Sequence, residues 1–165
     1  MNIFVLDQNP ALAAQYHCDK HVIKMILESA QLLSTALGHG YKPTHVNHPC
    51  SIWVRKSRDN ALWLIDLAGN LNAEYQKRYC KLTEHKSYTV IKSIIPYIDR
   101  LPPLGLTPFV QAMPIEFQNE DPVKAYRDYY RTAKSKIATW RNGAPSWYRP
   151  DTNNKTREMS SILTA

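Results

Sequence analysis

The sequence predicts an all-α protein, a single compact domain of four to five helices with one histidine-rich loop and one proline-rich connection. Apolar residues recur at the three- and four-residue spacing of helices, and no segment alternates apolar and polar residues for long. Its 165 residues are 44% hydrophobic and 21% charged, which excludes collagen-like, coiled-coil and disordered classes. We expect residues 1–148 to form this domain and the polar residues 149–165 to form a mobile tail.

The first helix is predicted from its start and stop signals. It follows an apolar run at residues 2–6, which is either one brief strand or a packed arm. Asn9 is a good N-cap, and Pro10 suits the first helical position. The helical pattern continues to about Leu37 and stops at Gly38.

The middle of the chain alternates between loops and helices. Residues 38–50 form the histidine-rich loop, and a helical pattern covers about 51–81 with Ser57 as a candidate break. A short helix follows at about 85–97. The apolar face of the 51–81 pattern comprises Leu64, Leu67, Leu71 and Tyr75.

The last helix follows a long connection, residues 99–121, that is punctuated by prolines. Asp121 and Pro122 repeat the N-cap and proline signal, and the pattern runs to about Trp140. Apolar residues at helical spacing are expected in the core: Val123, Tyr126, Tyr130, Ala133, Ile137 and Trp140.

The charge of the chain favours a phosphate-bearing partner. Lys and Arg number 21 against 14 Asp and Glu, so the formal net charge is +7. No stretch approaches 18 uninterrupted apolar residues, and the first residues lack the pattern of a signal peptide. Three cysteines are typical of reduced thiols in a cytosolic protein. We expect a nucleic-acid or nucleotide partner, no membrane, and the cytoplasm of the host cell.

A polar stripe on the first predicted helix is the main candidate site. His17, His21, Lys24 and Glu28 fall within about 60° of one another when each residue turns about 100°. The stripe faces away from the helix's apolar side, so it is either a solvated face or the wall of a site. We assign candidate catalytic roles to His21, Lys24 and Glu28, together with Asp19.

Asp19 stands near the centre of the apolar face of that helix. A buried carboxylate needs a partner. Asp19 therefore either orients a histidine from the following loop or caps a second helix after a break near Tyr16. Lys20, beside it, is a candidate ligand-binding residue, as is His17.

The histidine-rich loop is expected to fold back along the first helix and share its site. His45 and His48 are candidate ligand-binding residues, and Arg55 and Arg58 would close the far side. The alternatives are a metal site and a purely structural loop whose polar groups are hydrogen-bonded within the protein. The ligand spacing is not that of a zinc motif, so we assign no metal and no cofactor. Histidines beside these cations should have lowered pKa values.

Two further features have a binding and a structural interpretation. Trp53 and Trp63 flank basic residues, which suits base stacking, although large aromatic residues on helices more often anchor a core. A basic stripe on the last helix is expected to contact phosphates, with a solvated face as the alternative. Its residues are Lys124, Arg127, Arg131 and Lys134.

Several motifs resemble a widespread family of small tailed-phage proteins of unknown function. They are MNIFVLD, HCDKHVIKMILESAQLLSTA, YKPTHVNHPCSIWVR, EYQKRY, the AMP at 112–114 and AYRDYYRTAK…W…PSWY, and together they span roughly residues 1–148. The resemblance implies a phage origin and a role inside the infected cell. A looser, compositional likeness links the chain to phage pyrimidine-dimer glycosylases. Their nucleophilic N-terminal threonine is missing, because this chain starts Met1-Asn2, so their mechanism is not carried over.

Three functions remain open from the sequence. The first is an enzyme acting on a nucleic-acid base or nucleotide, either glycosylase- or lyase-like or a nucleotide hydrolase. The second is a non-catalytic protein that sequesters a cyclic-nucleotide or nicotinamide-derived immune signal. The third is a DNA-binding accessory protein. The sequence does not decide whether the chain is an enzyme, nor its oligomeric state.

Overall fold

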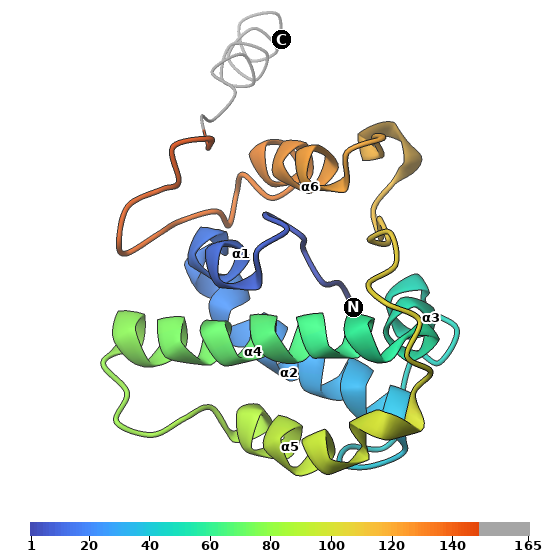
Figure 1. The fold of residues 1–165 in the computed structure, drawn as a ribbon. Coiled ribbons are helices and arrows are strands. Elements are labelled where there is room, and N and C mark those ends of the chain that lie inside the picture. The colour runs from blue at the N-terminus through green and yellow to red at the C-terminus, as the bar shows by residue number, and fades with distance from the viewer. Residues whose placement is uncertain (149–165) are drawn as a thin grey trace, which may run out of the picture.

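Two long helices, α2 (Asp19–Leu37) and α4 (Arg58–Tyr79), cross at the centre of the fold, as Figure 1 shows. Helix α1 (Pro10–Tyr16) packs on α4, whereas α3 (Pro49–Lys56) and α5 (Lys86–Ile94) pack on α2. This computed structural model describes residues 1–148, in which no residue belongs to a β-strand. The predicted all-α class is confirmed. The tail predicted at 149–165 lies outside the described residues.

The remaining elements connect α5 to the top of the molecule. A 3-10 helix (Ile95–Arg100) continues α5, and a second one (Ile115–Phe117) precedes α6 (Pro122–Arg131). In Figure 1, α6 lies above α1 and the N-terminal arm, on the side of the fold opposite α5. None of the helices in this described part of the chain is long and apolar enough to cross a membrane.

The first predicted helix is in fact two helices. His17 and Cys18 have extended backbone angles, with ψ of 134° and 159°, and they separate α1 from α2. The prediction of one helix to Leu37 is therefore wrong, and the alternative of a break near Tyr16 is confirmed. Contacts from distant segments stabilise the break: Arg78 donates to the carbonyl of His17, and the Asp19 N–H donates to the carbonyl of Thr139.

Most other boundaries follow the local signals. The Asn9 side chain accepts from the N–H groups of Ala11 and Leu12, and Gly38 ends α2 in the left-handed conformation. Ser57 breaks the middle pattern, where its hydroxyl caps α4. The last helix is shorter than predicted, because the backbone leaves helical geometry at Thr132.

The core lies between α2 and α4 and is closed by α6. Tyr126 and Tyr130 are fully buried, as predicted for the last helix, whereas Ala133 is exposed beyond its end. Trp53 and Trp63 are core residues, and their indole N–H groups donate to the carbonyls of Pro108 and Gln8. The structural interpretation of these tryptophans therefore holds.

Asn60 fixes the proline-rich connection to the helical core. Its buried amide donates to the Trp53 carbonyl (2.7 Å) and the Thr107 hydroxyl (2.8 Å), and its side-chain oxygen accepts from the Thr107 N–H (2.9 Å). We expect Asn60→Ala to lower the free energy of unfolding by about 1–3 kcal/mol, because buried polar groups lose their partners. Urea denaturation measures the change. Asn70→Ala on the exposed side of the same helix is the control and should change it by less than about 0.5 kcal/mol; equal effects would contradict the prediction.

Candidate functional site

The N-terminal arm, residues 1–6, is a packed segment without strand structure and forms one wall of the candidate site. Asn2 holds its shape: the side-chain oxygen accepts from the N–H groups of Ile3 (2.8 Å) and Phe4 (3.2 Å), and the amide donates to the Ala112 carbonyl (2.8 Å). Phe4 has a φ of 35°, an uncommon left-handed value for a residue with a side chain. Backbone strain of this kind persists only where surrounding contacts enforce it.

Glu28 anchors the arm to α2. Its Oε2 accepts from the Asn2 N–H at 2.9 Å and lies 3.6 Å from the Met1 amino group. Its Oε1 lies 3.6 Å from Nζ of Lys24, one helical turn earlier. Glu28 is nearly buried, whereas the Lys24 side chain is 64% exposed. The carboxylate is thus held in place, and the lysine amine remains free to move.

His21 lies about two helical turns before Glu28 on α2. Its Nδ1 and the Tyr130 hydroxyl are 2.5 Å apart, and its ring stacks on Phe4 with the centroids 4.5 Å apart. Burial, followed by the charges of His17, Lys134 and Lys24, lowers the pKa of His21 to about 3. The imidazole is therefore neutral near pH 7 and serves as a hydrogen-bonding group rather than a cation.

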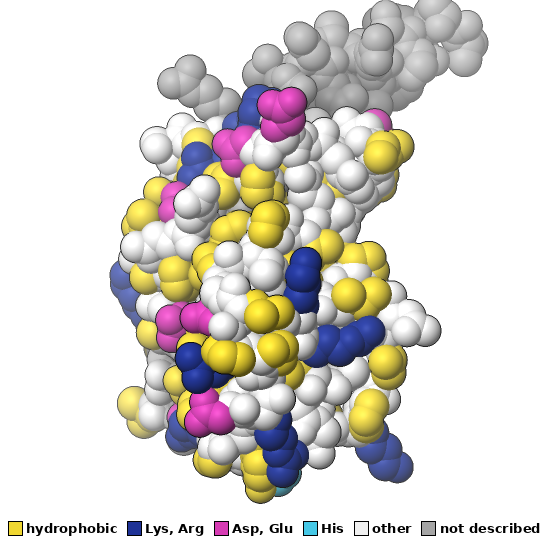
Figure 2. Space-filling model, turned by 45° about the vertical axis from the view of Figure 1, so that its right-hand side comes forward, with side chains coloured by type: hydrophobic (Ala, Val, Ile, Leu, Met, Phe, Trp, Pro, Cys, Tyr) yellow, Lys and Arg dark blue, Asp and Glu magenta, His cyan; other side chains and the backbone are white. Residues whose placement is uncertain are grey.

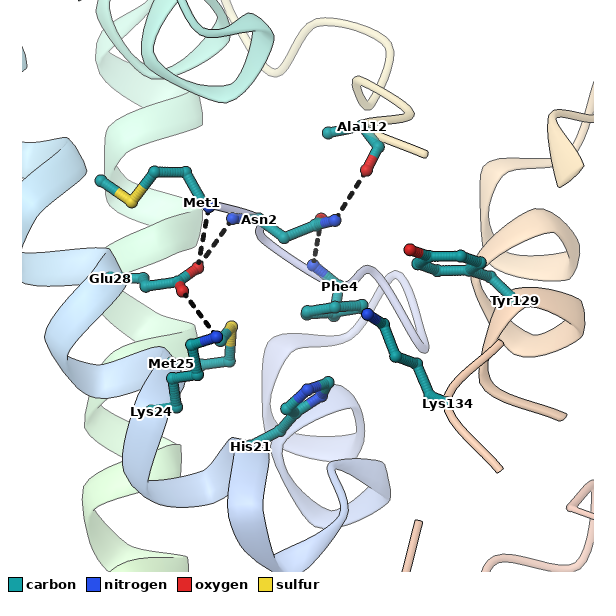
Figure 3. A pocket seen from close by; sticks show the side chains of 10 residues that line it. All are labelled: Met1, Asn2, Phe4, His21, Lys24, Met25, Glu28, Ala112, Tyr129 and Lys134. Atoms are coloured by element: carbon teal, nitrogen blue, oxygen red, sulfur yellow. Dashed lines mark hydrogen bonds and ion pairs between the residues drawn. The ribbon is translucent and has the colours of Figure 1, made fainter. Parts of the chain in front are cut away.

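These groups surround one polar pocket with a cavity volume of about 200 Å³. Figure 3 shows Glu28, Lys24 and His21 on the α2 side, facing Tyr129 and Lys134 across the arm. The complete lining is Met1, Asn2, Phe4, His21, Lys24, Met25, Glu28, Ala112, Tyr129 and Lys134. One carboxylate, three amines and a neutral imidazole can act on a single small ligand there.

The polar stripe of the first helix is not a solvated face. His17, His21 and Glu28 are all buried, and only Lys24 is exposed. A single continuous helix would place this side in solvent. In the structure, the break before α2 and the N-terminal arm packed against α2 bury it. Ile23, an apolar residue of the same helix, is 37% exposed.

His17 lies beneath the pocket and does not line it. Its ring is fully buried, Nδ1 hydrogen-bonds to the Ala13 carbonyl at 2.7 Å, and Nε2 has no partner among the described residues. Burial is the main cause that lowers the pKa of His17 to about 4. The histidine pKa values are lowered as expected, but desolvation is the first cause, and Arg55 and Arg58, the cations expected to lower them, are not among the causes for His17, His21 or His48.

Asp19 and Lys20 lie outside the pocket lining. Asp19 is the first residue of α2 and pairs with the buried Arg78 guanidinium at 3.2 Å. It orients no loop histidine, and it does not cap α2, because Cys18 occupies the N-cap position; the break near Tyr16 is present, but neither role expected of Asp19 is. Lys20 is exposed.

The histidine-rich loop does not line the pocket. His48 is the N-cap of α3, where its Nδ1 accepts from the Cys50 N–H, and exposed His45 hydrogen-bonds to the Thr44 hydroxyl. Arg55 donates to the Val46 carbonyl, and Arg58 pairs with Asp99 at 3.1 Å. The shared-site expectation therefore does not hold for the loop and these two arginines.

Most of the predicted basic stripe makes internal contacts. Lys124 and Arg131 both pair with Asp128, and Arg127 pairs with Asp7 at 3.1 Å while also packing over the Trp147 ring. On the face seen in Figure 2, Lys and Arg side chains lie interspersed with Asp and Glu. Lys134, beyond the end of α6, is the one member of the stripe that lines the pocket.

Sequence reasoning found four of the lining residues and missed the other six. His21, Lys24 and Glu28 were found by helical spacing, and Lys134 was found as part of the basic stripe. The others are Met1, Asn2, Phe4, Met25, Ala112 and Tyr129. The apolar run at 2–6 was the one signal for the arm, and nothing local indicated that it crosses the face of α2.

The described residues contain no group of three His, Cys, Asp or Glu side chains arranged to hold a metal ion. The fold and pocket define an all-helical domain with a small polar, basic site. Comparison with protein-family models, with curated proteins and with solved structures finds no match to this chain. The residues that line the pocket are therefore the basis for assigning a function.

Proposed function

We propose that this protein is an enzyme that acts on a nucleotide or a nucleic-acid base, and that the pocket holds the reacting nucleotide. One observation supports this proposal above the others. A fixed carboxylate, Glu28, shares a small pocket with the amines of Lys24 and Lys134. A carboxylate can transfer a proton in general acid–base catalysis, and two amines can bind a phosphate-bearing molecule.

The roles follow from position and charge. Glu28 is the proton carrier, because it is the one carboxylate in the lining, whereas the pKa of His21 near 3 makes its imidazole a weak base at neutral pH. Lys24 and Lys134 bind the negative charge of the substrate. The half-buried ring of Tyr129 offers an aromatic surface for a base, whereas Phe4 is buried and already stacks on His21.

Glu28→Gln tests the catalytic assignment. The substitution keeps the shape and most hydrogen bonds of Glu28 but removes its proton-accepting charge. We expect turnover to fall by about 100-fold or more, a typical loss for a general acid or base. The assay follows base or phosphate release by mass spectrometry, using nucleotides and strands with damaged or abasic sites.

Glu116→Gln, on the exposed second 3-10 helix, is the matched control and should retain full turnover. Thermal unfolding of both variants checks the fold. Wild-type turnover in Glu28→Gln would show that the carboxylate only anchors the arm.

A non-catalytic nucleotide-binding protein is the second candidate. Both oxygens of Glu28 already face positive groups, Lys24 on one side and Met1 on the other, which also suits a purely structural carboxylate. This candidate includes sequestration of a cyclic-nucleotide or nicotinamide-derived signal in a phage-infected cell, in line with the family resemblance. Stoichiometric capture without product would favour it over the enzyme.

A further inference from the structure

The charge of the pocket restricts the kind of phosphate it accepts. Lys24, Lys134 and the Met1 amino group are positive, and Glu28 is the one negative group in the lining. With His21 neutral, the lining carries a net charge of +2. Glu28 balances the amino group that it anchors, so the two lysines provide the excess.

A phosphodiester carries one negative charge, both within a strand and in a cyclic nucleotide. A phosphate monoester carries about −1.5 to −2 at pH 7 and presents three strong acceptor oxygens. We propose that the pocket binds a terminal phosphate, as found on a nucleoside monophosphate or on the phosphorylated end of a strand. This inference rests on the proposed function and names the substrate class of the same site.

The donors of the pocket suit such a group. Nζ of Lys134 lies 5.0 Å from the centre of the Tyr129 ring and has no carboxylate partner within residues 1–148. Lys24 is mostly exposed and long enough to turn from Glu28 toward a ligand. His21 adds Nε2, because Nδ1 is occupied by Tyr130; Nε2 carries the ring's proton and donates in the tautomer in which Nδ1 accepts from the Tyr130 hydroxyl. Three separate donor groups can therefore meet the three terminal oxygens.

Titration calorimetry with matched ligands tests the inference. Each of AMP, GMP, CMP and UMP is compared with its 3′,5′-cyclic form and its nucleoside, so that only the phosphate differs. We expect at least one monophosphate to bind about 10-fold or more tightly than its cyclic form, since the monoester presents a third terminal oxygen and additional negative charge to the two lysines. A 5′-phosphorylated hexanucleotide and its 5′-hydroxyl form distinguish a strand end from a free nucleotide, and preference for phosphate in either pair supports the inference.

Lys134→Gln localises the effect to the pocket. The variant should weaken monophosphate binding by about 10- to 100-fold, the equivalent of one hydrogen bond to a charged group, and should leave cyclic-nucleotide binding nearly unchanged. Lys136→Gln, two residues away and exposed, is the charge-matched control and should bind as the wild type does. Thermal unfolding confirms that both variants fold.

The two proposals fail in different ways. Equal or tighter binding of the cyclic forms, with Lys134→Gln affecting both forms alike, would overturn the terminal-phosphate inference and leave the proposed function standing. If no nucleotide and no strand binds, both fail.

Discussion

Replacing Arg78 with methionine should lower the free energy of unfolding by about 3–5 kcal/mol, the usual result of removing one partner from a buried ion pair. The Arg78 side chain is 2% exposed on α4 and pairs with Glu74 at 2.7 Å and Asp19 at 3.2 Å. Methionine fills similar space but leaves both carboxylates without their cation.

The same guanidinium also completes the junction between α1 and α2. It donates to the carbonyls of Gln15 (2.8 Å) and His17 (2.7 Å), which have no helical partner where α1 ends. Loss of these bonds should loosen the junction as well as the ion pairs. Since α1 packs on α4, these bonds also help to hold the two helices together.

Urea denaturation followed by circular dichroism measures the effect. Arg141→Met is the matched control: Arg141 stacks on the Tyr79 ring but is exposed, and its loss should change stability by less than about 1 kcal/mol. Adding Asp19→Asn and Glu74→Gln to the Arg78 variant should recover part of the loss, because the unpaired charges are then removed. A change below about 1 kcal/mol in Arg78→Met would contradict this account, and if that variant does not fold, the two carboxylate variants alone test it.

Acidification from pH 6.5 to about pH 4 should destabilise the protein steeply. Burial lowers the pKa of His17 to about 4 and that of His21 to about 3, from an ordinary value of 6.5. Below pH 6.5 the histidines of the unfolded chain become protonated, whereas the two buried rings of the folded chain stay neutral. The free energy of unfolding therefore falls as the pH falls. The two buried histidines give a slope of about 3 kcal/mol per pH unit inside this window, and His48 and His85, which are less buried and also have lowered pKa values, add a smaller amount.

The pH window, and not the sign, distinguishes the histidines from the carboxylates. Their stabilising contribution is complete above pH 6.5, is lost as the pH falls toward about 4 and 3, and changes no further below those values. The lowered pKa of Asp128 also costs stability in acid, but only below its ordinary value of 3.8. Above pH 4 most of the slope belongs to the histidines, with a smaller addition from surface Glu84, whose lowered pKa starts from an ordinary value of 4.5.

Urea denaturation at pH 7.5, 6.0, 5.5 and 5.0 tests the prediction. His21→Gln removes one of the two titrating groups and should roughly halve the slope, to about 1.4 kcal/mol per pH unit. If the free energy of unfolding of the wild type is the same at pH 7 and pH 5, the two rings are protonated in the folded protein at no cost in stability, and the prediction is wrong.

Local chemistry in the sequence determined the helical elements. Caps, prolines and helical period act within a few residues, and the starts at Pro10 and Pro122 and the stop at Gly38 follow from them. The spacing of His21, Lys24 and Glu28 on one helix was equally local, so this part of the candidate site could also be predicted.

Only the tertiary structure decided where helices are interrupted and which polar side chains meet. The break at His17 depends on Arg78, 61 residues later, and α6 ends at Arg131 although its apolar pattern continues. The pocket joins His21 to Tyr130, 109 residues apart, and Asn2 to Ala112, 110 residues apart. Helical period assigns a residue to one side of its own helix, but burial of that side depends on which distant segment packs there. The N-terminal arm packs across the polar stripe of α2. The stripe therefore forms the wall of a pocket and not a solvent-exposed face.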